Sequence, residues 1–167
     1  MAKMTGRWSA APAIAGIVAL AALGLAACDG SSASAAGSVS ARETILPKVE
    51  AAYGQISADE ASFRQAVSRC TGDNTYKCVI KLELVLNLQY VEFSHALEAI
   101  RMPSGAPAAA ASRLVASTDQ TVQDFKLIVT ATSMKQYVRL VDGTGVLAQA
   151  NQIVTGYGAL IKALRRM

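Results

Sequence analysis

The chain has 167 residues and a mass of 17.4 kDa, with 52% hydrophobic and 17% charged residues. This length suits one domain with its own hydrophobic core. The 16 Lys and Arg residues outnumber the 12 Asp and Glu residues, but they are scattered along the chain. Because they form no basic stripe that would follow a phosphate backbone, the sequence argues against a nucleic-acid-binding protein.

The first 28 residues pass from basic to apolar to small residues. Lys3 and Arg7 form the basic start, no charge follows from Ala10 to Ala27, and the run ends in Leu25-Ala26-Ala27-Cys28. This is the layout of a secretory signal. The cysteine at its end resembles the lipobox of bacterial lipoproteins, a resemblance that covers residues 1–28 only. It implies that residues 1–27 are a signal peptide that is removed and that Cys28 is acylated, for example with palmitate.

An uncleaved transmembrane helix over residues 8–27 is the alternative, because this stretch is long enough to cross a bilayer. It is rich in Ala and Gly, however, and no cluster of positive residues follows it to stop transfer. We therefore favour a lipoprotein on the extracytoplasmic face of the cell membrane. Asp29 after the acylated cysteine resembles an inner-membrane retention signal of enteric-type bacteria. It has no such meaning in a bacterium with one membrane, so the choice of membrane stays open.

Removal of the signal would leave 140 residues with 14 Lys and Arg against 12 Asp and Glu. Residues 28–39 are small and polar, which predicts a flexible tether next to the lipid. The helical bundle domain is expected over residues 40–167. Ser40-Ala41-Arg42-Glu43 has the form of a capping box, so we expect the first helix to begin there. Pro47 predicts a later start or a bend. The expected buried positions of this helix are Ile45, Val49, Ala52, Ile56, Phe63, Ala66 and Cys70.

Cys70 and Cys78 enclose a turn-rich segment between the first and second expected helices. Export places the two thiols where disulfides persist. A redox pair is the alternative, but the spacing is not Cys-x-x-Cys. We therefore predict a structural disulfide, which would stabilise the fold by roughly 2–3 kcal/mol on the loop-entropy model.

The second expected helix, about Thr75 to Arg101, is apolar on more than one side. Its expected inward positions are Val79, Leu82, Leu86, Gln89, Phe93, Ala96 and Ile100. Leu84, Leu88 and Val91 form a second apolar stripe on the opposite face. Either the irregular segment 133–145 covers this stripe, or the stripe is a surface for a protein partner. We favour cover by segment 133–145, because large exposed apolar patches are uncommon on monomers.

Two further long helices and one short helix complete the expected domain. The third helix is expected over about Ala108 to Ala131, a short helix over Met134–Val141, and the last over Val146–Arg165. Chain breaks are indicated at Thr132-Ser133 and at Asp142–Gly145, and the position of the main break stays open. Gly156 and Gly158 in the last helix indicate a close helix contact or a bend. Short connections predict an all-α, antiparallel up-down four-helix bundle with an extra short helix before the last helix.

The catalytic and metal-binding candidates are few. Glu92 and His95 have the Glu-x-x-His spacing of di-iron bundles, which need this motif on two helices. The chain has one histidine, so a second Glu-x-x-His motif is missing. The expected register also puts His95 on the outer side. The sequence also lacks the Gly-x-Ser-x-Gly motif that carries the nucleophilic serine of many hydrolases. We therefore predict no enzyme, no metal site and no cofactor.

The function expected is that of a membrane-anchored binding or scaffolding module whose protein partner the sequence does not identify. The alternative is a carrier that holds a small apolar or lipid-like ligand between the helices, as bundle pockets do. Polar contacts to that ligand would come from Gln89, Thr118 and Thr121.

Overall fold

The computed structural model describes residues 35–72 and 75–167. Within these ranges it contains the helices α1 (Ala35–Val67), α2 (Thr75–Glu98), α3 (Ala106–Ile128), α4 (Met134–Thr144) and α5 (Val146–Arg165), and no strand. The predicted signal peptide, Cys28 and most of the predicted tether lie outside the described residues. None of the described helices is long and apolar enough to cross a membrane.

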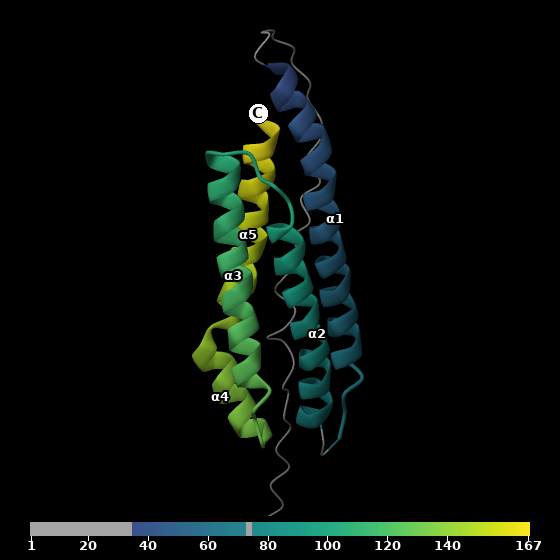
Figure 1. The fold of residues 1–167 in the computed structure, drawn as a ribbon. Helices are drawn as coiled ribbons and strands as arrows, with labels where there is room; N and C mark the ends of the chain where they lie inside the picture. Colours follow the sequence, from purple (N-terminus) through teal and green to yellow (C-terminus); the bar gives the residue numbers. More distant parts are fainter. Residues whose placement is uncertain (1–34, 73–74) are drawn as a thin grey trace, which may run out of the picture. The chain divides into compact units, whose positions relative to one another are not determined.

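The four long helices form the predicted up-down bundle, with the short α4 before the last helix (Figure 1). Neighbours in the bundle are α1 with α2, α2 with α3, and α3 with α5, and α3 and α5 share the most extensive contact. The contact between α1 and α5 that closes the ring is much smaller. The core is built from aliphatic and aromatic side chains of the four long helices, including Val49, Leu86, Leu114, Ile128 and Leu160.

Helix α1 begins earlier than predicted. It starts at Ala35, so Ser40 lies inside the helix rather than at its cap, and five residues of the expected tether are helical. Alanine has the highest helix propensity, which allows Ala35 and Ala36 to continue the helix outward. Pro47 lies inside α1 and does not mark its start.

The connections use the residues that turn chemistry predicts. Ser133 caps α4, because its side-chain Oγ accepts a hydrogen bond from the backbone N–H of Gln136 at 3.3 Å. Gly145, at φ 72°, separates α4 from α5 in a left-handed conformation that suits glycine. Both predicted breaks are therefore used, and Asp142 and Gly143 belong to α4.

A disulfide joins Cys70 to Cys78, with 5.7 Å between their Cα atoms. Cys70 follows the end of α1 and Cys78 lies in the first turn of α2. The bridge therefore ties the two helices together at the turn that connects them, as the sequence predicted.

The two glycines of α5 differ in their surroundings. A Cβ atom built on Gly156 would lie 3.3 Å from Leu114 Cδ1 and 3.6 Å from Leu114 Cα, whereas one on Gly158 would meet nothing within 4 Å. Gly156 therefore lets α5 approach α3 closely. Gly158 makes no such contact, so the expected close approach holds for one of the two glycines.

This difference predicts that alanine at Gly156 and alanine at Gly158 will change the stability of the protein by different amounts. Gly158→Ala should stabilise the protein by up to about 1 kcal/mol, because alanine loses less backbone entropy in a helix. Gly156→Ala gains the same propensity but crowds the fully buried Leu114, so it should be less stable than Gly158→Ala by on the order of 1 kcal/mol. Urea unfolding of both variants checks the difference. Equal stability would contradict a tight contact at Gly156.

Candidate functional site

The outer face of α2 carries three large apolar side chains in contact with solvent. Leu84 is 47% exposed, Val85 56% and Leu88 62%. We call these three residues the α2 patch. Val91, predicted to belong to this face, is half-buried and packs against the core. The apolar spacing of the helix did not assign Val85 to this face, because an apolar residue beside other apolar residues gives no sign of its direction.

The orientation of α2 differs from the predicted one. The buried apolar positions are Val79, Leu86, Tyr90, Phe93 and Leu97. Tyr90 and Leu97 replace the predicted Gln89 and Ala96: Gln89 is only half-buried, and Ala96 is exposed. Tyr90 packs against Phe125 of α3 with 5.7 Å between ring centroids, and its hydroxyl donates to Glu60 of α1. Contacts of Tyr90 with both neighbouring helices, a ring contact with α3 and a hydrogen bond to α1, thus set the rotation of α2, which the apolar pattern of α2 alone left undetermined.

This rotation buries polar residues while it exposes leucines. Glu83 and Asn87 are 3% and 9% exposed, although each precedes an exposed leucine by one position. One carboxylate oxygen of Glu83 and the amide oxygen of Asn87 are buried without a hydrogen-bond partner among the described residues. Along this part of α2 the usual arrangement of apolar residues inside and polar residues outside is therefore reversed.

The expectation that segment 133–145 covers the stripe of Leu84, Leu88 and Val91 is wrong for the two leucines, which are exposed. This segment forms α4, which contacts α2 through the Tyr137 hydroxyl, a donor to Glu83 Oε1 at 2.7 Å. Glu83 is buried whereas Leu84 and Leu88 are exposed, so α4 packs on a different side of α2 from the two leucines. Both leucines remain exposed in the presence of α4.

The carboxyl group of Glu83 is almost completely buried. Burial raises its pKa from 4.5 to about 7, and the hydrogen bond from Tyr137 opposes this rise only in part. Burial, followed by the neighbouring Glu83, also raises the pKa of the Tyr137 hydroxyl. The sequence offered no signal for this pair, because the two residues are 54 positions apart.

The residues predicted to line a ligand cavity do not come together as a polar lining. Thr118 and Thr121 are fully buried, but their hydroxyls donate to the backbone of their own helix, to Leu114 O at 2.9 Å and Ser117 O at 3.0 Å. Gln89 is half-buried on α2. No contact between these side chains favours the carrier interpretation, which stays a prediction.

Glu92 and His95 lie on the solvent side of α2, both exposed, in agreement with the predicted direction of His95. Among residues 35–72 and 75–167, no group of three or more His, Cys, Asp or Glu side chains is placed to hold a metal ion.

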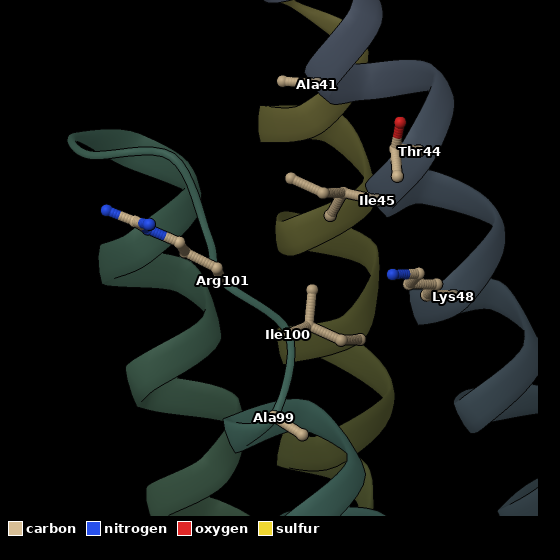
Figure 2. Close-up of a pocket in the computed structure, with 7 residues that line it drawn as sticks. All are labelled: Ala41, Thr44, Ile45, Lys48, Ala99, Ile100 and Arg101. Atoms are coloured by element: carbon tan, nitrogen blue, oxygen red, sulfur yellow. The ribbon is translucent and has the colours of Figure 1, made fainter.

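A second surface feature lies where α1 meets the segment after α2. It is a groove of about 460 Å³ lined by Ala41, Thr44, Ile45, Lys48, Ala99, Ile100 and Arg101. Figure 2 shows Ile45 and Ile100 between Lys48 on α1 and Arg101 on the α2–α3 connection, with the guanidinium of Arg101 extending away from the isoleucines. The groove has an apolar floor with one basic residue on each side of its rim. Sequence analysis missed it because its residues come from two segments about 55 positions apart.

No protein-family model, curated protein or solved structure matches this chain. The candidate surfaces are therefore interpreted from their own chemistry.

The raised pKa of Glu83 predicts a pH-dependent stability. Between pH 4.5 and about 7 the folded state keeps a proton that the unfolded state has released, so the free energy of unfolding falls as pH rises through this window. The shift corresponds to roughly 3 kcal/mol at about pH 8. Glu83→Gln keeps an acceptor for Tyr137 and removes the ionisation. The variant should therefore be more stable than the wild type at about pH 8, by up to roughly that amount, and lose its advantage near pH 4.

Denaturant unfolding across this pH range measures the effect, with Glu92→Gln on the exposed side of α2 as the control. The control should follow the wild-type pH profile. A Glu83→Gln profile parallel to that of the wild type would contradict the raised pKa.

Proposed function

We propose that this protein is an extracytoplasmic lipoprotein, held on the membrane by acylation of Cys28, whose helical bundle binds a protein partner through the α2 patch. The basic, apolar and small-residue pattern ending in Leu25-Ala26-Ala27-Cys28 supports the anchor. The Cys70–Cys78 disulfide agrees with an oxidising compartment. The proposed role is binding or scaffolding, without catalysis or a cofactor.

The reversed polarity of α2 is the observation that carries the partner surface. Leaving a leucine in water rather than burying it forfeits about 1.5–3 kcal/mol. Burying Glu83 and Asn87 with unpaired oxygens adds a desolvation cost. An isolated bundle gains nothing from exposing Leu84 and Leu88 next to these groups. A partner that covers both leucines would recover the forfeited burial when it binds.

The shape of the α2 patch suits a helix of the partner. Leu84 and Leu88 are four residues apart on one helix face, the spacing that packs against an apolar helical stripe. Lys81 and Glu92, both exposed, flank the leucines with opposite charges. A partner helix with an acidic residue near Lys81 and a basic residue near Glu92 would therefore be selected in one direction.

The geometry favours a different protein over a second copy. Two copies paired in parallel through this face would place Lys81 opposite Lys81, which is unfavourable. Antiparallel pairing would match Lys81 with Glu92, but it would send the starts of the two α1 helices to opposite ends of the dimer. Two chains anchored close to the start of α1 in one membrane do not suit that arrangement.

Acylation of Cys28 is tested by its replacement. Cys28→Ser should abolish labelling with a clickable fatty acid and leave the precursor unprocessed, because both reactions of a lipobox need the thiol. Gel mobility and acyl labelling of the two proteins in their own cells provide the measurement. A Cys28→Ser protein that is still labelled and runs at mature size would exclude this anchor.

The α2 patch is tested by Leu84→Ser/Leu88→Ser in the full-length protein. Because both side chains are exposed, each change should shift the free energy of unfolding by less than about 0.5 kcal/mol. A photo-crosslinking residue at Lys81 should form an adduct with one protein in the native membrane, and the double substitution should remove that adduct.

Leu147→Ser/Val154→Ser is the matched control, because these residues of α5 are 46% and 45% exposed. It should leave the adduct at Lys81 intact. An adduct of two copies of this chain would contradict the choice of a different protein. An adduct that survives Leu84→Ser/Leu88→Ser would contradict the patch itself.

A further inference from the structure

We infer that the groove between α1 and the α2–α3 connection binds the phosphate headgroup of an anionic membrane phospholipid, with Lys48 and Arg101 as its cationic contacts. The inference rests on the proposed lipid anchor for its orientation. It adds a direct contact between the folded domain and the bilayer surface.

The first argument is the chemistry of the groove. Lys48 and Arg101 are exposed, and no carboxylate of the described residues forms an ion pair with either side chain. Ile45 and Ile100 lie between them in Figure 2, with Ala41 and Ala99 completing the apolar floor. A phospholipid presents a phosphate next to acyl chains, so its anionic part fits the rim and its apolar part fits the floor. Lys and Arg are both common phosphate ligands, and Arg can bind two oxygens at once.

The second argument is the position of the groove in the bundle. The ion pair between Arg165 and Glu50, at 3.5 Å, places the end of α5 beside the first half of α1. The groove itself places residues 99–101 beside residues 41–48. The first half of α1, the α2–α3 connection and the end of α5 therefore share one end of the bundle (Figure 1). We call this the groove end.

The groove end is also the end nearest to the proposed anchor along the chain. Cys28 precedes Ala35, the first residue of α1, by seven positions. Seven residues span at most about 25 Å when fully extended. A lipid on Cys28 would therefore keep the start of α1 within about 25 Å of its attachment point, and the groove end is the end of the bundle that follows directly.

The third argument is an uneven distribution of charge. The groove end, taken as residues 41–50, 98–113 and 162–167, has seven Lys and Arg side chains against three Glu. The other described residues have seven Lys and Arg against seven Asp and Glu. The small net charge of the whole domain thus hides one basic end and one neutral remainder. A basic end close to an anionic surface is attracted to it over about one Debye length, roughly 8–10 Å at physiological salt.

The test uses dihexanoyl phosphatidylglycerol, a short-chain anionic lipid, titrated below its micelle-forming concentration into the full-length protein in a zwitterionic detergent. Lys48→Gln/Arg101→Gln should weaken binding roughly tenfold or more, because both cations that flank the apolar floor are lost and each attracts an anionic headgroup. Arg69→Gln/Lys77→Gln is the matched control, because it removes one Arg and one Lys, both exposed and outside the groove end. The control should bind like the wild type.

Two control ligands and the comparison of the two variants each exclude one other explanation. Dihexanoyl phosphatidylcholine should bind much more weakly, and equal binding would overturn the role of the two cations. Inorganic phosphate should also bind much more weakly, and equal binding would overturn a membrane lipid as the source of the anion. Equal affinities of the Lys48→Gln/Arg101→Gln and control proteins for phosphatidylglycerol would overturn the site.

A second measurement places the contact at the membrane. In vesicles of phosphatidylcholine with phosphatidylglycerol, amide hydrogen exchange over residues 41–48 and 99–105 should be at least severalfold slower than in vesicles of phosphatidylcholine alone. Unchanged exchange would overturn a contact with the bilayer. The lipid titration does not depend on acylation, whereas the labelling of Cys28 does, so failure of the anchor and failure of the groove are separate results.

Discussion

The bundle depends on the close approach of α3 and α5. Gly156 lies against Leu114, whose side chain is fully buried, and the neighbouring Leu160 and Leu164 of α5 are fully buried as well. Because α3 also packs along α2, this contact joins the second half of the chain to the first. Helix α1 is attached chiefly to α2, by packing, by the disulfide and by the hydrogen bond from Tyr90 to Glu60. The contact between α3 and α5 is thus the strongest one in the ring of helices.

The weakest seam, between α1 and α5, is held by surface and aromatic contacts. Tyr53 and Tyr157 stack with 3.6 Å between ring centroids, and Glu50 pairs with Arg165 where both side chains are largely exposed. Exposed ion pairs contribute little to stability. The groove opens beside this seam, on the first half of α1. Because α1 packs extensively against α2 but only weakly against α5, the fold has room for a surface groove at α1.

The rotation of α2 connects the fold to the proposed partner surface. Three requirements compete along this helix: Tyr90 and Phe93 must fill the core, Glu83 must have a hydrogen-bond partner, and Leu84 and Leu88 must be buried. The first two are satisfied within the chain, whereas Leu84 and Leu88 stay exposed. The exposed leucines and the buried Glu83 therefore have the same origin, since one rotation of one helix produces both.

The sequence by itself determined the all-α bundle, the helix connections, the short fourth helix and the disulfide. These features follow from local signals: apolar spacing, glycines and capping residues, and the position of two cysteines around one turn. Only the tertiary structure decided which face of α2 is buried, where α4 packs, and that Lys48 and Arg101 share a groove. Each of these depends on contacts between helices distant in sequence. Where a helix such as α2 is apolar on several sides, its neighbours rather than its own pattern choose the buried face.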